Sequence, residues 1–205
     1  MSDESPLTPE ERQRRVVRLC CMFMRSLAFF RAGLQPEVPP KLFARTHPQG
    51  WFWRGVHGNF MDMCVLDWCK LFADYKSEHH WHRVVDDRVR FKKDLCAALG
   101  IRSAEFTKMI KEVEHYRNKF VAHLDEERVM RFPKWELPKK AVAFLHEHLA
   151  QQAHSHEDWR RLGLPATAEE IDRGSAHSFQ EAQSVYAEAM ARFVYRAEGD
   201  LIADG

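Results

Sequence analysis

The sequence has few glycines, few prolines and no paired cysteine pattern, and each shortage excludes a class of fold. Of its 205 residues only nine are glycine and nine are proline, and these gather between the apolar-periodic stretches. That distribution favours helices over many short strands joined by tight turns. The five cysteines include no CxxC pair, which indicates free thiols in a reducing cytoplasm rather than disulfides or a zinc ribbon.

The sequence also lacks an excess of charge of one sign and a long hydrophobic run. The net charge is +1, so any basic surface must be local. No stretch approaches the roughly 18 uninterrupted apolar residues of a membrane-spanning helix, and residues 1–11 lack the apolar core of a signal peptide. With 45% hydrophobic and 30% charged residues the composition is globular. We therefore expect a cytoplasmic protein with no membrane partner.

Caps and apolar periodicity predict an all-α protein, an up-and-down bundle of five to six helices. Thr8 and Glu11 form a capping-box pattern around Pro9, and Gly33 stops the helix that follows. A second box begins at Thr167, and residues 34–50 are expected to be a loop. The expected helices cover residues 8–32, 51–75, 86–99, 103–123, 138–153 and a C-terminal stretch from 167 with a break at Gly174.

Three arginines of the first expected helix lie on one side of it. Arg14, Arg18 and Arg25 are separated by steps of four and seven residues, which return to nearly the same angle around a helix, opposite the apolar stripe. The usual interpretation of such a stripe is a solvated face. The alternative is a contact surface for an RNA backbone.

Three histidines fall close together in the segment Glu78-His79-His80-Trp81-His82. Adjacent and i,i+2 positions do not converge on one face of a helix, and the sequence offers no matching second ligand pair. We interpret these histidines as surface or packing residues and expect neither a metal site nor a cofactor.

The end of the fourth expected helix carries three polar residues that suggest a site. Arg117 follows Val113 by four positions and so lies along the apolar stripe, where an arginine is either a partly buried ion-pair partner or a group directed into a cleft. Asn118 and His123 add polar groups near the same helix end. In a purely structural role, His123 would close the C-terminus of the helix, where a positive charge is favoured by the helix dipole.

The string Arg117-Asn118-Lys119-Phe120-Val121-Ala122-His123, on a helix of an all-helical protein, resembles the signature of the HEPN superfamily. That signature is an arginine, often followed by asparagine, then a histidine after four to six residues. The segment 65–72 and the string "RNKFVAHLD" look similar to HEPN domains associated with abortive phage infection. Asp125 stands where HEPN toxins regulated by tyrosine modification often carry tyrosine, so that regulation is not expected.

The resemblance implies a metal-independent endoribonuclease, a toxin or a phage-defence effector, with an antitoxin or defence protein as a further partner. RNA supplies its own 2′-hydroxyl nucleophile, so the protein needs to manage protons and charge. His123 would exchange the proton near neutral pH, Arg117 would stabilise the charge on phosphorus, and Asn118 would orient a phosphate oxygen or the histidine. Lys119 and the three arginines of the first helix are the expected RNA contacts. The products would be a 2′,3′-cyclic phosphate and a 5′-hydroxyl.

Helix geometry constrains this site. On a straight helix Arg117 and His123 would lie about 9 Å apart along the axis and about 120° apart around it, so one helix could not direct both at one phosphate. Either the chain bends before His123, or two copies pair across a two-fold axis. The HEPN resemblance implies a composite site at a dimer interface, and we expect a homodimer.

Two other functions stay open at this point. The Arg117 and His123 pocket could belong to a non-catalytic module that binds a nucleotide, RNA or a partner protein, or both residues could be structural. Burial of Arg117 against a carboxylate would favour the structural role. The predicted organisation is a HEPN-like bundle over residues 8–153 and a C-terminal helical extension, 154–205, packed on the same domain.

Overall fold

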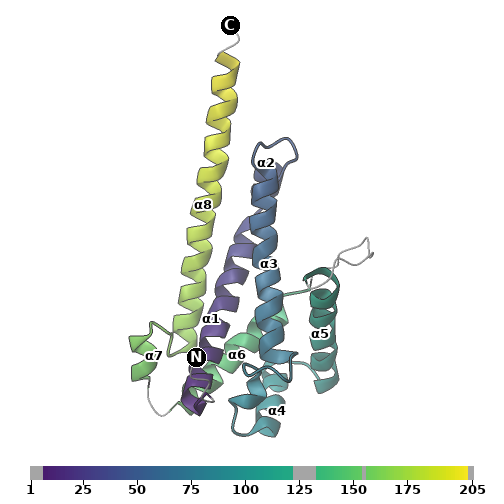
Figure 1. Cartoon of the computed structure of the whole chain (residues 1–205), viewed down its shortest axis with the longest axis vertical. Helices are drawn as coiled ribbons and strands as arrows, with labels where there is room; N and C mark the ends of the chain where they lie inside the picture. The colour runs from purple at the N-terminus through teal and green to yellow at the C-terminus, as the bar shows by residue number, and fades with distance from the viewer. Residues whose placement is uncertain (1–6, 122–132, 154–155, 203–205) are drawn as a thin grey trace, which may run out of the picture. The chain divides into compact units, whose positions relative to one another are not determined.

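The computed structural model describes residues 7–121, 133–153 and 156–202, with the side chains of residues 120, 121 and 193–202 excepted (Figure 1). The described residues form α-helices, one 3₁₀ turn and one π-helical turn, and include no strand. The predicted all-α helical bundle is therefore confirmed. None of the described helices has both the length and the apolarity needed to cross a bilayer.

The described part of the chain holds eight α-helices, where five to six were expected. The long ones follow the predicted pattern, and the short α2 and α7 account for the larger number. The helices are α1 (Pro9–Gly33), α2 (Val38–Leu42), α3 (Gly50–Phe72), α4 (Arg88–Leu99), α5 (Ser103–Tyr116), α6 (Glu136–Gln152), α7 (Glu157–Arg161) and α8 (Ala168–Ile202), with a 3₁₀ turn η1 (Trp81–Arg83) and a π-helical turn η2 (Arg117–Val121).

The first helix begins at the capping box that the sequence predicts. The Thr8 backbone N–H donates to the Glu11 carboxylate at 2.9 Å, and the Glu11 N–H donates to the Thr8 hydroxyl at 3.2 Å. Two of the unpaired amides at the helix start are thereby satisfied. Hydrogen bonding to Thr8 lowers the pKa of Glu11, so the carboxylate that makes the box is kept ionised.

Four local expectations were wrong. Residues 34–50 are not all loop, because Pro39 fits the first turn of a short helix, α2. The cap of α5 is Arg102 rather than Ser103, and its N–H is held by Glu105 at 2.8 Å. α8 runs through Gly174 without a break, since an isolated glycine costs a helix only about 1 kcal/mol. The fourth expected helix changes to π-helical winding at Arg117.

The chain divides into two compact units. Unit 1 comprises residues 1–24 and 64–172, and unit 2 comprises residues 25–63 and 173–205. The boundaries between these units differ from the predicted boundary between residues 153 and 154. The predicted organisation, a bundle over 8–153 with an extension over 154–205 packed on it, stays a prediction.

Unit 1 packs the first part of α1, the end of α3 and the helices α4 to α7 around an aliphatic and aromatic core. Edge-on contact between Phe72 and Phe106, 6.0 Å between ring centroids, joins α3 to α5. The 5.7 Å contact of Phe23 with Trp135 joins α1 to the start of α6. The largest fully buried side chains in the core of unit 1 are Trp68, Phe23, Phe72, Phe91, Phe106, Met24, Leu71, Leu95 and Leu145.

Unit 2 has an aromatic core built from the end of α1, α2, the start of α3 and part of α8. Phe43 lies 4.9 Å from the ring of His57 and 6.2 Å from that of Tyr186, and Trp53 lies 5.8 Å from Tyr186. At Gly33 a β-carbon would collide with the His57 imidazole and lie 2.9 Å from the Tyr186 hydroxyl. The absence of a side chain at Gly33 therefore allows these rings to pack against α1.

Candidate functional site

The predicted site begins where α5 ends, and the backbone there is wound differently from an α-helix. α5 ends at Tyr116, and Arg117 to Val121 form a π-helical turn. π-Helical turns are rare in proteins, and those that do occur are often found at functional sites. The geometry of one straight α-helix therefore does not apply to residues 117–121, and both alternatives, a bend before His123 and pairing of two copies, stay predictions.

Arg117 is the best-defined residue of the predicted site. Its side chain is 18% exposed, which agrees with its place on the apolar stripe beside the buried Val113 and Tyr116. The guanidinium Nη1 donates to the Asp74 carboxylate, and Nη2 lies 3.5 Å from the Glu114 carboxylate. Of the two roles that the sequence allows, the structure has the partly buried ion pair.

The third guanidinium nitrogen is engaged as well. Arg117 Nε donates to the side-chain oxygen of Asn118 at 3.1 Å, while Asn118 itself is exposed. Desolvation disfavours the charged guanidinium, but the hydrogen bond and charge of Asp74, with Glu114, raise the pKa of Arg117. The arginine is thus cationic and held in one orientation, and its two carboxylate partners give the trio a formal charge of −1.

Asp74 and Glu114 come from different elements, which explains why the sequence did not reveal the cluster. Glu114 lies three positions before Arg117 on the same helical face, so this pair is local. Asp74 follows the end of α3, and its N–H donates to the Cys69 carbonyl at 2.8 Å. Only the packing of α3 against α5 brings Asp74 to Arg117, and no spacing in the sequence signals it.

Cys69 lies close to the same cluster but is not a reactive thiol. The residue is fully buried, and this burial raises the pKa of its thiol to about 12, while Arg117 lowers it and the two carboxylates raise it. A thiol needs its pKa lowered to act as a nucleophile near neutral pH. All five cysteines are free, as predicted.

The predicted roles of two site residues, His123 and Lys119, stay predictions. His123 lies outside the described residues. Lys119 is half-buried on the π-helical turn, and its predicted contact with RNA stays a prediction.

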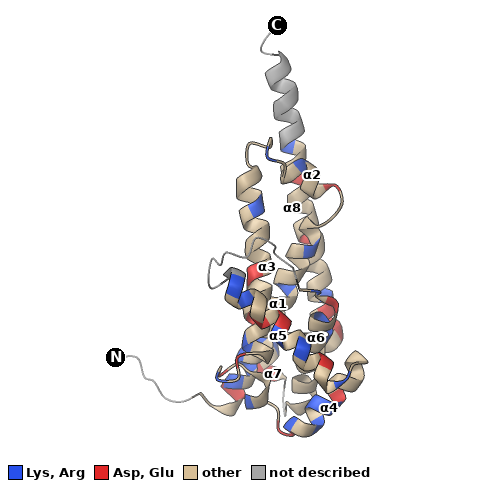
Figure 2. Cartoon of the chain, turned by 90° about the vertical axis from the view of Figure 1, so that its right-hand side faces the viewer, with Lys and Arg blue, Asp and Glu red and all other residues tan. Residues whose placement is uncertain are grey.

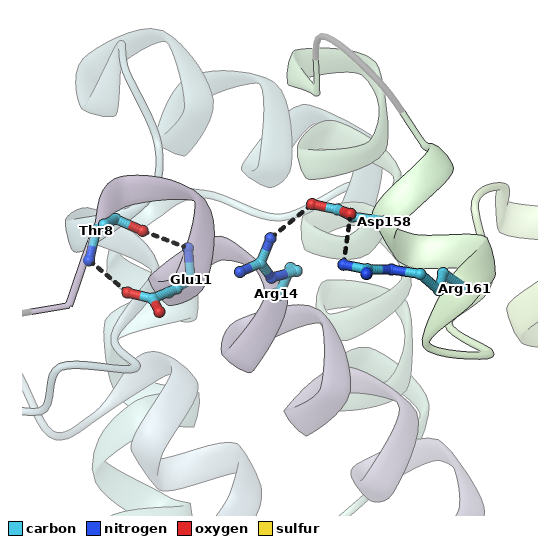
Figure 3. A network of polar contacts seen from close by, with 5 residues as sticks. All are labelled: Thr8, Glu11, Arg14, Asp158 and Arg161. Carbon is cyan, nitrogen blue, oxygen red and sulfur yellow. Dashed lines mark hydrogen bonds and ion pairs between the residues drawn. The ribbon is translucent and has the colours of Figure 1, made fainter.

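The arginines of α1 do not form one uniform surface. Arg14 is half-buried and donates to the Asp158 carboxylate at 2.9 Å, and the other oxygen of Asp158 accepts from Arg161 at 3.0 Å (Figure 3). Arg18 and Arg25 are exposed, as a solvated face requires. In Figure 2, Lys and Arg as well as Asp and Glu are scattered over the helices. Arg14 therefore has a structural ion pair, and RNA binding by this stripe stays a prediction.

The histidine segment packs against its neighbours, which fits the predicted packing role. The His82 ring stacks on Tyr75 with 4.0 Å between centroids, and His80 accepts a hydrogen bond from the His82 N–H at 3.3 Å. Burial lowers the pKa of His80 to about 4, against a bond to the Phe72 backbone that raises it. Within the described ranges no group of three or more His, Cys, Asp or Glu could hold a metal ion.

In comparisons with known proteins, no family model matches this chain, and neither a curated protein nor a solved structure matches it significantly. The HEPN resemblance therefore rests on the Arg117 to His123 segment and on the helical fold that carries it.

Proposed function

We propose that this chain is a metal-independent endoribonuclease of the HEPN type, with Arg117 as its charge-stabilising group and His123 as its proton carrier. The observation that carries the proposal is a cationic guanidinium held in one orientation beside the exposed Asn118, on a π-helical turn of an all-helical protein. The carboxylates that hold it also fit the structural role that the sequence left open. Preorganised cations of this kind stabilise charge that develops in a transition state.

RNA that binds at this site must displace one of the two carboxylates that contact Arg117. Asp74 and Glu114 cancel the charge of Arg117 in the resting protein, and they repel a phosphate. The scissile phosphate would replace one carboxylate on the guanidinium, because phosphate and carboxylate use the same bidentate hydrogen-bonding geometry. Asp74, 35% exposed, and Glu114, 40% exposed, both have room to turn toward water.

The reaction in this proposal is attack of the RNA 2′-hydroxyl on the adjacent phosphorus. The P–O2′ bond forms and the P–O5′ bond breaks, leaving a 2′,3′-cyclic phosphate and a 5′-hydroxyl. His123 takes the 2′-hydroxyl proton, and the leaving 5′-oxygen takes a proton from a second acid, which is the His123 of a second copy if the protein is a homodimer. A toxin or phage-defence effector with a protein antitoxin remains the biological setting that the resemblance implies.

A second candidate function is favoured by the same contacts. With all three guanidinium nitrogens occupied by Asp74, Glu114 and Asn118, Arg117 could serve only to join α3 to α5. The chain would then be a non-catalytic helical module that binds RNA, a nucleotide or a partner protein. In that case the loss of Arg117 lowers stability, and wild-type protein cleaves no RNA.

The test is cleavage of RNA by the purified full-length protein in EDTA, with analysis of the product ends. We expect cleavage by wild type and its loss in Arg117→Ala and His123→Ala. The control is Arg102→Ala, which removes an exposed arginine paired with a glutamate at the other end of α5. Intact RNA after incubation with wild type, or cleavage by both site variants, contradicts the proposal.

Asp74→Asn tests whether Asp74 restrains Arg117 in a protein that cleaves RNA. If Asp74 restrains Arg117 in the resting state, its neutralisation should leave cleavage intact or raise it while lowering stability. Light scattering tests the dimer separately, and a strict monomer that still cleaves RNA would place acid and base in one chain.

A further inference from the structure

We infer that the start of α3 in unit 2 is a binding surface for single-stranded RNA, on which unpaired bases stack against Trp51 and Phe52. The inference rests on the proposed function in taking RNA as the ligand. It concerns a different part of the chain from Arg117, and it specifies the class of RNA: unpaired strands rather than duplex.

The first observation is exposure of large aromatic rings. Trp51 is 79% exposed and Phe52 is 62% exposed, and the two residues are adjacent on the first turn of α3. The rings of Phe52 and the half-buried Trp53 pack in a T-shaped arrangement with 5.4 Å between centroids, and Trp53 in turn lies 5.8 Å from Tyr186 in the aromatic core of unit 2. Exposed aromatic side chains grouped in this way mark interaction surfaces.

The second observation is that the Trp51 ring is held in place. The Arg54 guanidinium carbon lies 4.4 Å from the centre of the Trp51 ring, one helical turn away. Arg54 is itself fixed, because its Nη1 donates to the Phe43 backbone carbonyl. One face of Trp51 therefore rests on a fixed cation, and the high exposure of the ring leaves area for another planar group to stack.

The third observation is the charge of the neighbouring sequence. Between Glu37 and Asp62, the 24 residues 38–61 include Lys41, Arg45 and Arg54 and no aspartate or glutamate. Lys41 and Arg45 are exposed, and no ion pair to either occurs within the described residues. This contrasts with Arg117 and Arg14, each of which is paired with a carboxylate.

A groove lies beside these aromatic residues. It has a volume of about 340 Å³ and is lined by Trp53 and Gln49 from the α3 end and by Val185 and Ala189 from α8. Glu188 also lines it, and this carboxylate lies 3.9 Å from Arg192. Trp53 thus contacts Phe52 and also lines a concave surface that can hold a further nucleotide.

Together these features match single-stranded RNA better than other partners. Every base offers a flat face that stacks on an aromatic ring, and the phosphates are attracted by the unpaired cations. Duplex RNA does not fit, because its bases are already stacked within the helix. An anionic lipid surface shares the same attraction to cations and to tryptophan, and the experiment separates it.

The experiment measures binding of the full-length protein to a labelled 2′-O-methyl oligouridine by fluorescence anisotropy. This probe lacks the 2′-hydroxyl nucleophile and cannot be cleaved, so binding is independent of catalysis. We expect Trp51→Ala/Phe52→Ala to weaken binding about tenfold or more, since stacking on an aromatic ring contributes a factor of this order per base. Val89→Ala, which truncates an 84% exposed side chain on α4, is the control and should bind as wild type does.

Charge reversal gives a second measurement. Lys41→Glu should weaken binding and lower its dependence on salt concentration, whereas Lys93→Glu, at another exposed lysine, should change it less. Trp51→Phe keeps an aromatic face and should retain most of the affinity. The circular dichroism of each variant should match that of wild type, because the replaced side chains are exposed.

Several outcomes overturn the inference. These are no binding of the oligouridine by wild type, equal binding by wild type and Trp51→Ala/Phe52→Ala, and binding to phosphatidylglycerol vesicles in place of the oligonucleotide. The proposed nuclease can fail independently: a protein that binds through Trp51 but cleaves no RNA retains this surface and loses the catalytic proposal. One that cleaves RNA in EDTA but is indifferent to Trp51 does the reverse.

Discussion

The polar cluster of unit 1 and the aromatic cluster of unit 2 hold their polar groups in opposite ways. Around Arg117, each charge faces another charge, from Asp74 and Glu114. In unit 2, polar groups face rings: His57 stacks on Phe30 at 4.7 Å, and Arg54 lies over Trp51. Within the described residues, His57 Nδ1 and the Tyr186 hydroxyl are buried without a hydrogen-bond partner.

This difference determines what each region tolerates. The unit 1 cluster is sensitive to the loss of a charge, because removing Arg117 leaves two carboxylates side by side. The unit 2 cluster is sensitive to the gain of a charge, because among the described residues no carboxylate compensates a proton on His57. Burial lowers the pKa of His57 to about 4 and raises that of Tyr186 to about 12, so both groups stay neutral at physiological pH.

The largest expected effect comes from adding a charge to unit 2. The pKa of His57 is lower in the folded protein than its unfolded value of 6.5, so the unfolded chain binds the proton more readily. The contribution of His57 to stability is complete above pH 6.5 and is lost between pH 6.5 and 4; it amounts to about 3 kcal/mol, since each pKa unit corresponds to about 1.4 kcal/mol. Urea unfolding across this range measures it.

His57→Phe is the variant that assigns this loss. It keeps a ring on Phe30 but cannot be protonated, so it should show a smaller fall in stability at pH 4.5 than wild type does. His80 in unit 1, whose pKa is also lowered to about 4, contributes to the remaining fall together with His79, His82 and His146, whose pKa values burial lowers as well. A pH dependence unchanged by His57→Phe would remove the distinction between the two regions.

The next effect tests the packing of the unit 2 cluster. Gly33→Ala places a methyl group against His57 and Tyr186, and we expect a loss of about 2 kcal/mol from overpacking. Gly58→Ala is the matched control, because a β-carbon there meets nothing within 4 Å. That variant should gain about 0.5–1 kcal/mol from higher helix propensity. Equal unfolding midpoints in urea for the two variants would contradict the close approach at Gly33.

A smaller difference, about 1 kcal/mol, is expected between the two arginines. Arg117→Ala should cost about 2 kcal/mol, because it leaves Asp74 and Glu114 partly buried without their cation. Arg54→Ala should cost about 1 kcal/mol, because it removes one hydrogen bond and a cation–π contact but leaves no charge behind. Asp74→Asn in the Arg117→Ala background should recover part of the loss. Chemical denaturation that ranks Arg54→Ala as the costlier change would reverse the comparison.

The smallest effect is expected for the Arg14 and Asp158 pair. Both side chains are partly exposed, 26% and 50%, and water screens their interaction. A double-mutant cycle with Arg14→Ala and Asp158→Ala should give a coupling free energy of about 0.5 kcal/mol, which falls at high salt. A coupling as large as that of Arg117 with Asp74 would show that exposure does not set the strength of ion pairs in unit 1.

The sequence by itself determined the helices that begin at caps and keep one apolar period. The Thr8 to Glu11 box, the stop at Gly33 and the apolar stripe of α5 are local, since each depends on residues three or four positions apart. The break predicted at Gly174 is absent, because one glycine costs a helix only about 1 kcal/mol. The turn of Arg117 to Val121 into a π-helix was equally hidden, because no residue type in that segment requires it.

Only the tertiary structure decided what surrounds the candidate residues. The sequence placed Arg117 on the buried side of its helix but could not name Asp74, which is 43 residues away and arrives through the packing of α3 against α5. The exposure of Trp51 could not be predicted either, because in the sequence it is one of many apolar residues of α3, whereas in the structure its side chain is 79% exposed. Caps and periodicity act between near neighbours in the chain, whereas ion pairs and exposed faces depend on which helices meet.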